Sequence, residues 1–450
     1  MQLKEIIKIL PTERVLTEPE DLFCYGFDAS SEGSLPIAVV KPVNTDEVSR
    51  VVRFAFENNI PIVPRGAGTG MTGGAVPLGN SIIVSLEGMN RIVDVDEKDM
   101  VVTVESGVIN SHLKERLESL NLFYPPDPSS MDFCTLGGNV AENAGGPRAI
   151  KYGVTRDYVL GLEVVLPNGS VLNTGVKTLK GVVGYDLTRL MVGSEGTLGI
   201  ITKIFLRVIP MPEETITLLC IFNELDKATQ SILEVMSTGI IPSTLEFMDR
   251  DSISAVERYR PHGLPEDAEA LLLIEVDGLH SAVAVEGERI AGICKASGGH
   301  VKVADGAFSR RWLWEARRSI SPALYHIAPL KINEDIVVPR SRIPEMIRRL
   351  KDIGRRNGLN IACFGHAGDG NIHVNIMTDR EDHERAKGVV KEIFEETLRL
   401  GGTISGEHGI GLTKLPYIKM EIPDTGIELM KAIKGVFDPK GIMNQGKIFP

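Results

Sequence analysis

The chain has 450 residues, which is too many for one hydrophobic core, so we expect two or three domains. Hydrophobic residues make up 43% and charged residues 24%, which is typical of a globular protein. The formal net charge is −11 and there is no long basic run, which excludes an electrostatic nucleic-acid interface. Because no stretch of about eighteen apolar residues and no secretory leader occur, we expect no transmembrane segment and a cytoplasmic location.

The first part of the chain predicts alternating strands and helices. Residues 1–10 predict a short amphipathic helix, and a helix at 44–59, capped by an Asn or a Thr, separates two predicted strands. The other expected elements are strands at 36–42, 60–66, 80–89 and 99–108, a helix at 110–122, a hairpin at 161–172 turning at Asn168-Gly169, and a closing stretch at 198–212.

A second unit is expected from residue 213. Strands at 215–222 and 269–278 alternate with helices at 224–239 and 281–297, which indicates a sheet backed by helices. We therefore predict domains at 1–212 and 213–410, followed by a C-terminal segment at 411–450.

The 46 glycines are concentrated in a few loops, the first of which is Arg65–Gly74. Gly68–Gly73 has the spacing GxGxxG, but the helix that a dinucleotide fingerprint requires does not follow it. A proline and a strand follow instead, and no GK[ST] of a phosphate-binding P-loop is present. The loop is therefore predicted to offer backbone N–H groups to an anion such as a pyrophosphate.

Two further glycine loops lie at 124–153 and 192–204. Few of their side chains can build a core, and bare backbone can lie against a flat ligand. Three such loops together predict a large ligand that has phosphates and a planar ring.

The stretches "PRGAGTGMTGG", "DPSSMDFCTLGGNVAENAGGPRAIKYG" and "VGSEGTLGIIT" resemble the flavin-binding domain of the vanillyl-alcohol-oxidase superfamily. The resemblance is closest to the branch of D-lactate dehydrogenases, D-2-hydroxyglutarate dehydrogenases and the flavin subunit of glycolate oxidase. It implies an α+β protein with a two-part FAD-binding domain, an α+β substrate (cap) domain and a C-terminal segment that returns to the flavin.

The resemblance also implies which residues hold FAD. Those expected at the pyrophosphate are Arg65, Gly66, Ala67, Gly68, Thr69, Gly70, Gly73 and Gly74. Those expected along the ribityl chain and isoalloxazine are Pro128, Ser129, Gly137, Gly138, Asn143, Gly145, Gly153, Glu195, Gly199 and Ile200, with Asn444 from the C-terminal segment. Because residues 64–77 contain no His or Cys, we expect FAD to be bound non-covalently.

The stretch "CFGHAGDGNIHVNIM" at 363–377 predicts two strands joined by a polar turn. In such a hairpin, His366 and His373 can face one site. A single histidine there would be read as part of a locally satisfied turn, but the Glu407-His408 pair in a second glycine-rich loop favours a ligand cluster. His366, His373 and Glu407 are the donor set of an open divalent-metal site, with Zn, Mn and Fe left open.

Adjacent residues of an extended segment point to opposite sides, so His408 can face the substrate when Glu407 faces the metal. Asp369 and Asn371 are expected to support the ligands. The resemblance implies that His408 is the catalytic base and that Arg317 binds the substrate carboxylate. For Arg310, Arg311 and Arg318, a basic helix face is the preferred interpretation.

The expected reaction is oxidation of a small (D)-2-hydroxy acid, such as D-lactate or glycolate, to the 2-keto acid by hydride transfer to flavin N5. Where the resembling hydroxyglutarate enzymes carry a lysine for a distal carboxylate, this chain has Asn333, with Lys331 nearby. That difference favours a small acid, and D-2-hydroxyglutarate stays an alternative substrate.

Other functions stay open from the sequence. They are a non-redox FAD transferase like the alkylglycerone-phosphate synthases, a metal hydrolase, and a binding subunit of an electron-transfer complex. The five cysteines form no CxxC pair, so electrons have to leave through a partner: an iron–sulfur subunit, an electron-transferring flavoprotein or a quinone-linked protein. Such a partner could hold the protein at a membrane surface, and a homodimer stays open.

Overall fold

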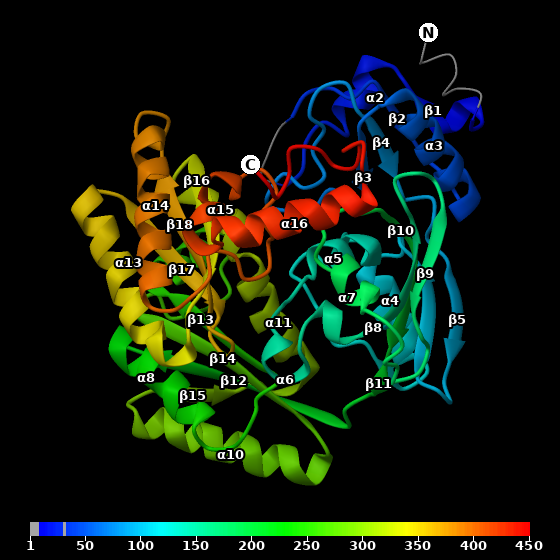
Figure 1. Ribbon diagram of the computed structural model, residues 1–450. Helices are drawn as coiled ribbons and strands as arrows, with labels where there is room; N and C mark the ends of the chain where they lie inside the picture. Colours follow the sequence, from blue (N-terminus) through cyan, green and yellow to red (C-terminus); the bar gives the residue numbers. More distant parts are fainter. Residues whose placement is uncertain (1–8, 30–32) are drawn as a thin grey trace. The chain divides into compact units, whose positions relative to one another are not determined.

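The computed structural model describes residues 9–29 and 33–450, so the helix expected from residue 1 lies outside the described residues (Figure 1). The chain divides into two compact units. The first comprises Met1–Gly145, Val154–Met211 and Glu407–Pro450, and the second comprises Gly146–Gly153 and Pro212–Gly406. The division differs from the expected boundaries because 146–153 groups with the second unit and 407–450 groups with the first.

The first unit begins with a four-stranded sheet of order β1-β2-β4-β3, in which β2, β4 and β3 are parallel. Its strands are β1 (Val15–Leu16), β2 (Ala38–Val40), β3 (Ile62–Arg65) and β4 (Ile82–Ser85). The crossover is helix α3 (Thr45–Asn58), and Asn44 caps it by accepting a hydrogen bond from the Glu47 N–H. The buried face of α3 packs with the strands into one core, as the apolar spacing of 44–59 predicts.

A second sheet of the first unit is antiparallel and has the order β5-β6-β10-β8-β9. Its strands are β5 (Ile92–Asp96), β6 (Val101–Glu105), β8 (Val159–Val165), β9 (Val171–Gly175) and β10 (Ile200–Arg207). Strands β8 and β9 form the hairpin expected at 161–172, and Gly169 in its turn has a φ of 83°. A short pair joins β7 (Leu122–Phe123) to β11 (Ile209–Pro210).

The helices of the first unit connect these sheets and form the end of the chain. They are η1 (Thr12–Arg14), α2 (Pro19–Phe23), α4 (Asn110–Glu118), α5 (Leu136–Glu142), η2 (Thr155–Asp157), α7 (Leu187–Met191), η5 (Leu415–Tyr417), α15 (Ile418–Glu421) and α16 (Asp424–Phe437).

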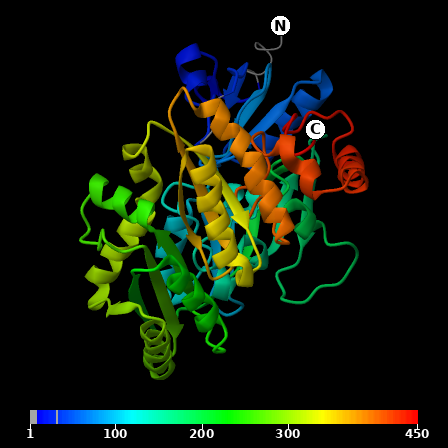
Figure 2. The same cartoon turned by 90° about the vertical axis from the view of Figure 1, so that its left-hand side faces the viewer.

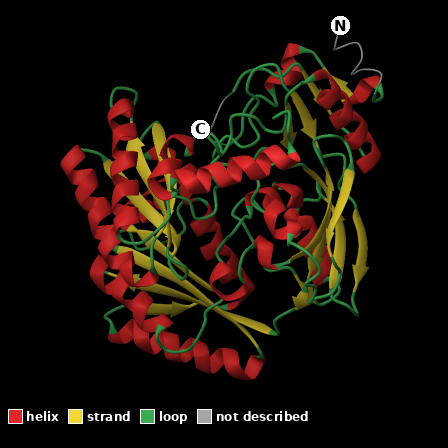
Figure 3. Cartoon of the chain, in the orientation of Figure 1, coloured by secondary structure: helices red, strands yellow, loops and turns green. Residues whose placement is uncertain are grey.

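The second unit is a seven-stranded antiparallel sheet of order β15-β12-β14-β13-β17-β18-β16 (Figure 3). Its strands are β12 (Glu214–Phe222), β13 (Thr244–Asp249), β14 (Ala270–Gly278), β15 (His300–Val303), β16 (Leu330–Val337), β17 (Asn360–His366) and β18 (Asn371–Thr378). Its helices are α6 (Ala149–Tyr152), α8 (Leu225–Met236), α9 (Arg250–Tyr259), α10 (His280–Ala296), α11 (Gly306–Arg318), α12 (Ile320–Ala323), η3 (Leu324–His326), η4 (Arg340–Arg342), α13 (Ile343–Asn357) and α14 (His383–Arg399).

The two faces of this sheet differ. Helix α10 packs on one face, where Gly287 lies against Ile216, and the neighbouring helices α13 and α14 run side by side (Figure 2). Helices α9, α11 and α12 share an apolar core with Met248, Phe364 and other residues of the opposite face. That opposite face also carries the polar residues of the candidate site.

Candidate active site

In the first unit, the backbone of the glycine loop after β3 lies in close contact with neighbouring side chains. A Cβ placed on Gly66 would lie 2.2 Å from Thr135 Oγ1, and one on Gly68 would lie 2.2 Å from Arg65 Nη2. Gly73 has a φ of 80° and donates its N–H to Asp28 Oδ2 at 2.7 Å. These glycines leave no room for side chains, so the loop presents bare backbone.

The second glycine loop meets the first through helix α5. Thr135, which touches Gly66, caps this helix by accepting the Gly138 N–H at 3.2 Å. Gly137 donates to the carbonyl of Ser106 at 2.7 Å, and a Cβ on Gly137 would lie 2.5 Å from Ser106 Cβ. Asn143 ends the helix with a φ of 54°.

The third glycine loop and the C-terminal segment converge on the same place. Asn444 donates from Nδ2 to the carbonyls of Gly74 at 2.9 Å and Glu195 at 2.7 Å. The Glu195 carboxylate accepts the N–H groups of Ile410 at 2.8 Å and Gly411 at 2.7 Å. Glu195, predicted as a flavin contact, therefore fixes the loop that directly follows Glu407 and His408.

Not every residue expected at the flavin lies at this convergence. Ile200 is fully buried in the apolar core of the first unit, and Gly199 lies against Val164. Ser129 is exposed and Pro128 is half-buried. Gly153 belongs to the segment that groups with the second unit.

A buried charge cluster at the convergence was missed by sequence reasoning. Lys447 is 3% exposed and donates to the carbonyls of Gly74 and Val76, at 3.1 and 2.8 Å. Burial lowers the pKa of Lys447 to about 8, although nearby carboxylates oppose the shift. Desolvation and then Glu195 raise the pKa of Glu142 well above its ordinary value. Lys447 also donates to Asn444 Oδ1 at 3.3 Å. No motif in the sequence marks Lys447, because the two carbonyls that it contacts lie far away in the chain.

In the second unit, the expected hairpin carries the two histidines. Strands β17 and β18 pair so that Phe364 lies opposite His373, and His366 ends β17 opposite Glu246 of β13. The imidazoles of His366 and His373 are 3% and 6% exposed, with ring centroids 5.2 Å apart. Alternation along the strands puts both rings on the face that α9, α11 and α12 cover.

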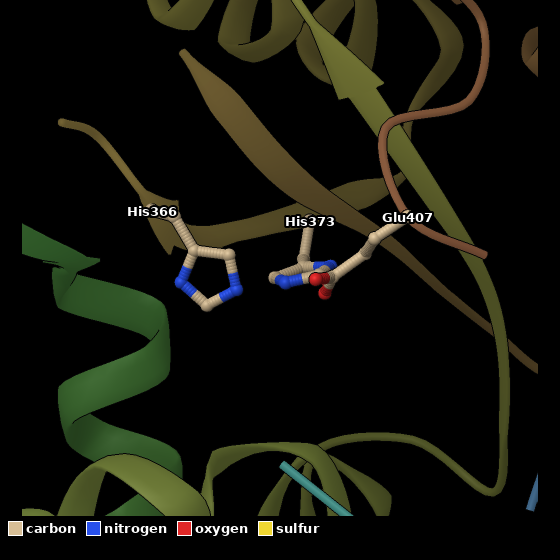
Figure 4. Close-up of side chains that lie close together, drawn as sticks. All are labelled: His366, His373 and Glu407. Carbon is tan, nitrogen blue, oxygen red and sulfur yellow. The ribbon is translucent and has the colours of Figure 1, made fainter. Parts of the chain in front are cut away.

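Glu407 joins these two histidines. The ligand atoms of His366, His373 and Glu407 all lie within 4.8 Å of one another, and Figure 4 shows both rings and the carboxylate turned toward one another. Gly406, the last residue of the second unit, donates its N–H to Asp335 Oδ2 at 2.9 Å. Within the first unit, Glu407 lies against Gly145. A Cβ added to Gly145 would lie only 2.8 Å from Glu407 Oε2.

Asp369 and Asn371, which were expected to support the ligands, contact each other and the neighbouring backbone. Asn371 donates from Nδ2 to the Ile336 carbonyl at 3.3 Å, and a Cβ on Gly406 would lie 2.2 Å from the same Nδ2. Asp369 Oδ1 accepts the Asn371 N–H at 3.2 Å. The extended segment expected at 407–408 is wrong: an irregular loop is found there, and the Thr72 hydroxyl donates to the His408 carbonyl at 3.1 Å.

Sequence reasoning also missed Glu246, which is fully buried on β13. Its Oε1 lies 2.7 Å from His366 Nδ1, and its Oε2 lies 2.5 Å from Arg317 Nη2. Burial acts to raise the pKa of Glu246, but Arg317 and His366 outweigh it and the pKa lies below its usual value. The side chain is therefore a carboxylate at neutral pH.

The arginines of α11 differ from the expected division of roles. Arg317 is 4% exposed, and its guanidinium lies over the Phe364 ring at 4.8 Å. Arg310, expected on a basic helix face, is half-buried, and its Nε donates to the buried Glu275 at 2.6 Å. Among the described residues, Arg317 Nε is buried without a hydrogen-bond partner.

Further polar contacts lie along β16 and β18, beyond His373. Asn333 donates from Nδ2 to Asn375 Oδ1 at 2.7 Å, and Asn375 lies two residues beyond His373. Lys331, two residues before Asn333, donates to the Ser321 hydroxyl at 2.6 Å. Burial lowers the pKa of Lys331 to about 8.

Among the described residues, no helix has the length and apolar character needed to cross a membrane.

Comparison with known proteins agrees with the flavin interpretation. Residues 36–175 match the family described as "FAD binding domain", and residues 211–448 match "FAD linked oxidases, C-terminal domain". Glycolate oxidase subunit GlcD of Bacillus subtilis (strain 168) is 46% identical over 430 residues, which cover 94% of this chain and 92% of that protein. D-lactate dehydrogenase of Anaerostipes hadrus is 36% identical over 99% of this chain and 97% of its own.

A solved structure shares the fold at low identity. The structure of p-cresol methylhydroxylase with substrate bound superposes with a TM-score of 0.84 at 18% identity, covering 99% of this chain and 96% of that one. The first two glycine loops predicted to hold FAD, 65–74 and 124–153, lie within the match to the FAD binding domain. The chain belongs to the family of FAD-linked oxidases and is an FAD-dependent oxidoreductase of the vanillyl-alcohol-oxidase type.

Proposed function

We propose that the protein oxidises a small (D)-2-hydroxy acid, such as D-lactate or glycolate, to the 2-keto acid, using FAD and a divalent metal. The observation that carries the proposal is the close group of His366, His373 and Glu407. Glu407 is followed directly by His408 in the sequence. Relatives named as a glycolate oxidase subunit and as D-lactate dehydrogenases support the substrate class.

The first unit fits FAD. Its three glycine loops meet, and Cβ atoms on Gly66 or Gly137 would overlap neighbouring atoms, so the backbone at these positions is left bare. Arg65 at the end of β3 supplies the positive charge that a pyrophosphate favours. We assign non-covalent FAD to residues 65–74, the α5 region, Glu195 and Asn444.

The group at the hairpin fits a divalent ion. Two neutral imidazoles and one carboxylate suit Zn, Mn or Fe and leave positions open for a substrate. The nearby carboxylates Asp335 and Glu246 are turned to other partners, which are the Gly406 N–H and the His366–Arg317 pair. That leaves three ligands from the chain.

When bound, FAD supplies the acceptor for a hydride from the substrate Cα, and the metal supplies the positive charge that acidifies the substrate hydroxyl. The chain's own part is to orient the acid and to take the proton. An imidazole nitrogen of His408 accepts the hydroxyl proton as general base, while the Cα–O bond becomes a carbonyl. Thr72 and Glu195 hold the loop on which His408 lies.

Arg317 is assigned to the substrate carboxylate. Its Nε is buried and has no hydrogen-bond partner among the described residues, so it keeps a donor for a ligand. The Phe364 ring and Glu246 fix the guanidinium plane from two sides.

The electrons are assigned to a partner protein. All five cysteines are free thiols and four are buried, so the chain has no metal–sulfur relay of its own. An iron–sulfur protein, an electron-transferring flavoprotein or a quinone-linked protein would meet this need.

The test is an anaerobic absorption spectrum of the FAD- and metal-loaded protein with D-lactate, L-lactate, glycolate and D-2-hydroxyglutarate in separate cuvettes. We expect D-lactate or glycolate to bleach the flavin band fastest. Reduction by D-2-hydroxyglutarate alone would move the substrate to a longer diacid. A flavoprotein that no hydroxy acid reduces would contradict the proposal and favour the non-redox transferase.

A further inference from the structure

Two buried glutamates lie on the same face of the second-unit sheet. Glu246 pairs with Leu273 across β13 and β14, and Thr244 pairs with Glu275. The glutamates are therefore two positions apart on neighbouring strands, with side chains on one side. Both are fully buried, so each carboxylate needs partners inside the protein.

Helix α11 supplies partners to both. Arg310, Trp314 and Arg317 are spaced four and three residues apart, which places them on one helix face. Arg310 and the Trp314 indole both donate to Glu275 Oε1, at 2.6 and 2.8 Å. Arg317 pairs with Glu246. The helix is therefore held on the sheet by two arginine–glutamate pairs.

The partner sets of the two glutamates differ. Glu275 also accepts the Thr217 hydroxyl at 2.6 Å, so all its partners belong to the framework of the unit. Glu246 divides its two oxygens between Arg317 and the ring of His366. One carboxylate thus touches both the residue assigned to the substrate and a residue assigned to the metal.

The contact of Glu246 with His366 determines which ring nitrogen of His366 carries the proton. An ionised carboxylate only accepts hydrogen bonds, so His366 Nδ1 must donate the proton across the 2.7 Å contact. The lone pair of the neutral ring then lies on Nε2, the nitrogen available for a metal. The same carboxylate forms an ion pair with the buried Arg317 guanidinium.

We propose that Glu246 is a positioning residue that orients His366 for the metal and Arg317 for the substrate carboxylate, so that metal binding and substrate binding depend on one side chain. This inference rests on the proposed function, because it assumes a metal on His366 and an acid on Arg317. It adds a residue that touches neither ligand.

The experiment measures metal affinity directly. Apo-protein is titrated with Co²⁺ and with Zn²⁺ against a competing chelator, for the wild type, Glu246→Gln and Glu275→Gln. Glu246→Gln is expected to weaken metal binding by about 10- to 100-fold, the usual effect of removing a carboxylate behind a ligating histidine. Glu275→Gln is the matched control, and we expect its metal affinity to stay within about threefold.

A second readout separates positioning from folding. With saturating metal, Glu246→Gln should raise KM for the reactive acid and change the visible spectrum of bound Co²⁺, whereas Glu275→Gln should change neither. If Glu246→Gln does not fold, Glu246→Asp keeps the charge but is one methylene too short to reach both partners. We then expect Glu246→Asp to lose part of the metal affinity or part of the substrate affinity.

The outcomes are distinguishable. If Glu246→Gln and Glu246→Asp bind Co²⁺ as tightly as the wild type, or if Glu275→Gln weakens it equally, Glu246 is only structural and the inference is overturned. If the wild type itself binds no metal at His366, His373 and Glu407, the metal part of the proposed function fails first. In that case the inference falls with it.

Discussion

The glycine loop at 65–74 and the hairpin at 360–378 are built in opposite ways. The loop consists mostly of glycine, so its backbone is bare and neighbouring segments and a ligand can approach it. The hairpin works through side chains, whose places are set by strand register and by buried carboxylates behind them. Binding of the cofactor and chemistry on the substrate should therefore be separable by mutation.

The largest expected effect is at His408. His408→Gln should lower the anaerobic rate of flavin reduction by about 10²- to 10⁴-fold, because it removes the general base. The FAD content should stay at the wild-type level. Stopped-flow absorbance measures the rate, and His112→Gln, on the exposed surface of α4, is the control. An unchanged rate in His408→Gln would assign the proton to another group.

A substitution at Gly66 should have the opposite effect: it should remove FAD and leave metal binding intact. A Cβ there would lie 2.2 Å from Thr135 Oγ1, so Gly66→Val should force the first two glycine loops apart. We expect the purified variant to have lost most of its FAD, measured as the ratio of flavin to protein absorbance, while Co²⁺ still binds. Full FAD occupancy in Gly66→Val would contradict a cofactor site made of backbone.

Glu195 tests how the loop with Glu407 and His408 is held. Glu195→Ala removes the acceptor of the Ile410 and Gly411 N–H groups, which should cost about 1–3 kcal/mol of folding free energy. Hydrogen–deuterium exchange of the peptide that contains these two amides should become faster. Unchanged protection would show that the contacts of Thr72 with His408 and Leu412 are sufficient to hold this segment.

The buried lysines Lys447 and Lys331 should make the folding stability depend on pH, one in each unit. Burial lowers the pKa of Lys447 and of Lys331 to about 8 from 10.5. Between about pH 8 and 10.5 the unfolded chain therefore binds more protons at these groups than the folded chain, so stability rises with pH. Each lysine contributes at most about 1.4 kcal/mol per pH unit.

Thermal unfolding of the wild type, Lys447→Met and Lys331→Met across this range measures the effect. Relative to either variant, the wild type should gain stability from pH 8 toward pH 10. A constant difference between the wild type and Lys447→Met would show that the ammonium is not destabilised by burial at this position.

The smallest effect is expected at glycines with no structural requirement. Gly435 in α16 and Gly292 in α10 have no atom near an added Cβ. Gly435→Ala and Gly292→Ala should each stabilise their helix by about 0.5–1 kcal/mol without changing FAD or metal content. Denaturant unfolding measures the change, and loss of FAD in Gly435→Ala would show a role that the helix position does not reveal.

Local patterns predicted elements in both units. The α3 cap at Asn44, the turn at Gly169 and the two histidine strands follow from residues close together in the chain. Glu246 could not be found this way, because its contact with His366 spans 120 residues and nothing near Glu246 marks it.

The return of the C-terminal segment to the flavin domain was expected from the resemblance, but its start was predicted at 411, whereas the first unit takes up the chain again at Glu407. Asn444 meets Glu195 across 249 residues, so the local sequence gives no sign that 407–410 belongs with the first unit. The resemblance to flavoproteins identified Glu195 and Asn444 as important. The structure adds that each also holds another segment of the chain, which follows from tertiary packing alone.

The central claim is that flavin retention and hydroxy-acid oxidation depend on separate parts of the chain. The most direct test mixes chelator-treated, FAD-saturated protein anaerobically with D-lactate or glycolate, and then restores Zn²⁺, Mn²⁺ or Co²⁺. We predict a flavin band that stays oxidised without metal and bleaches once metal is restored, with the FAD content constant. Rapid bleaching of the fully metal-free protein would contradict a role for His366, His373 and Glu407 in the reaction.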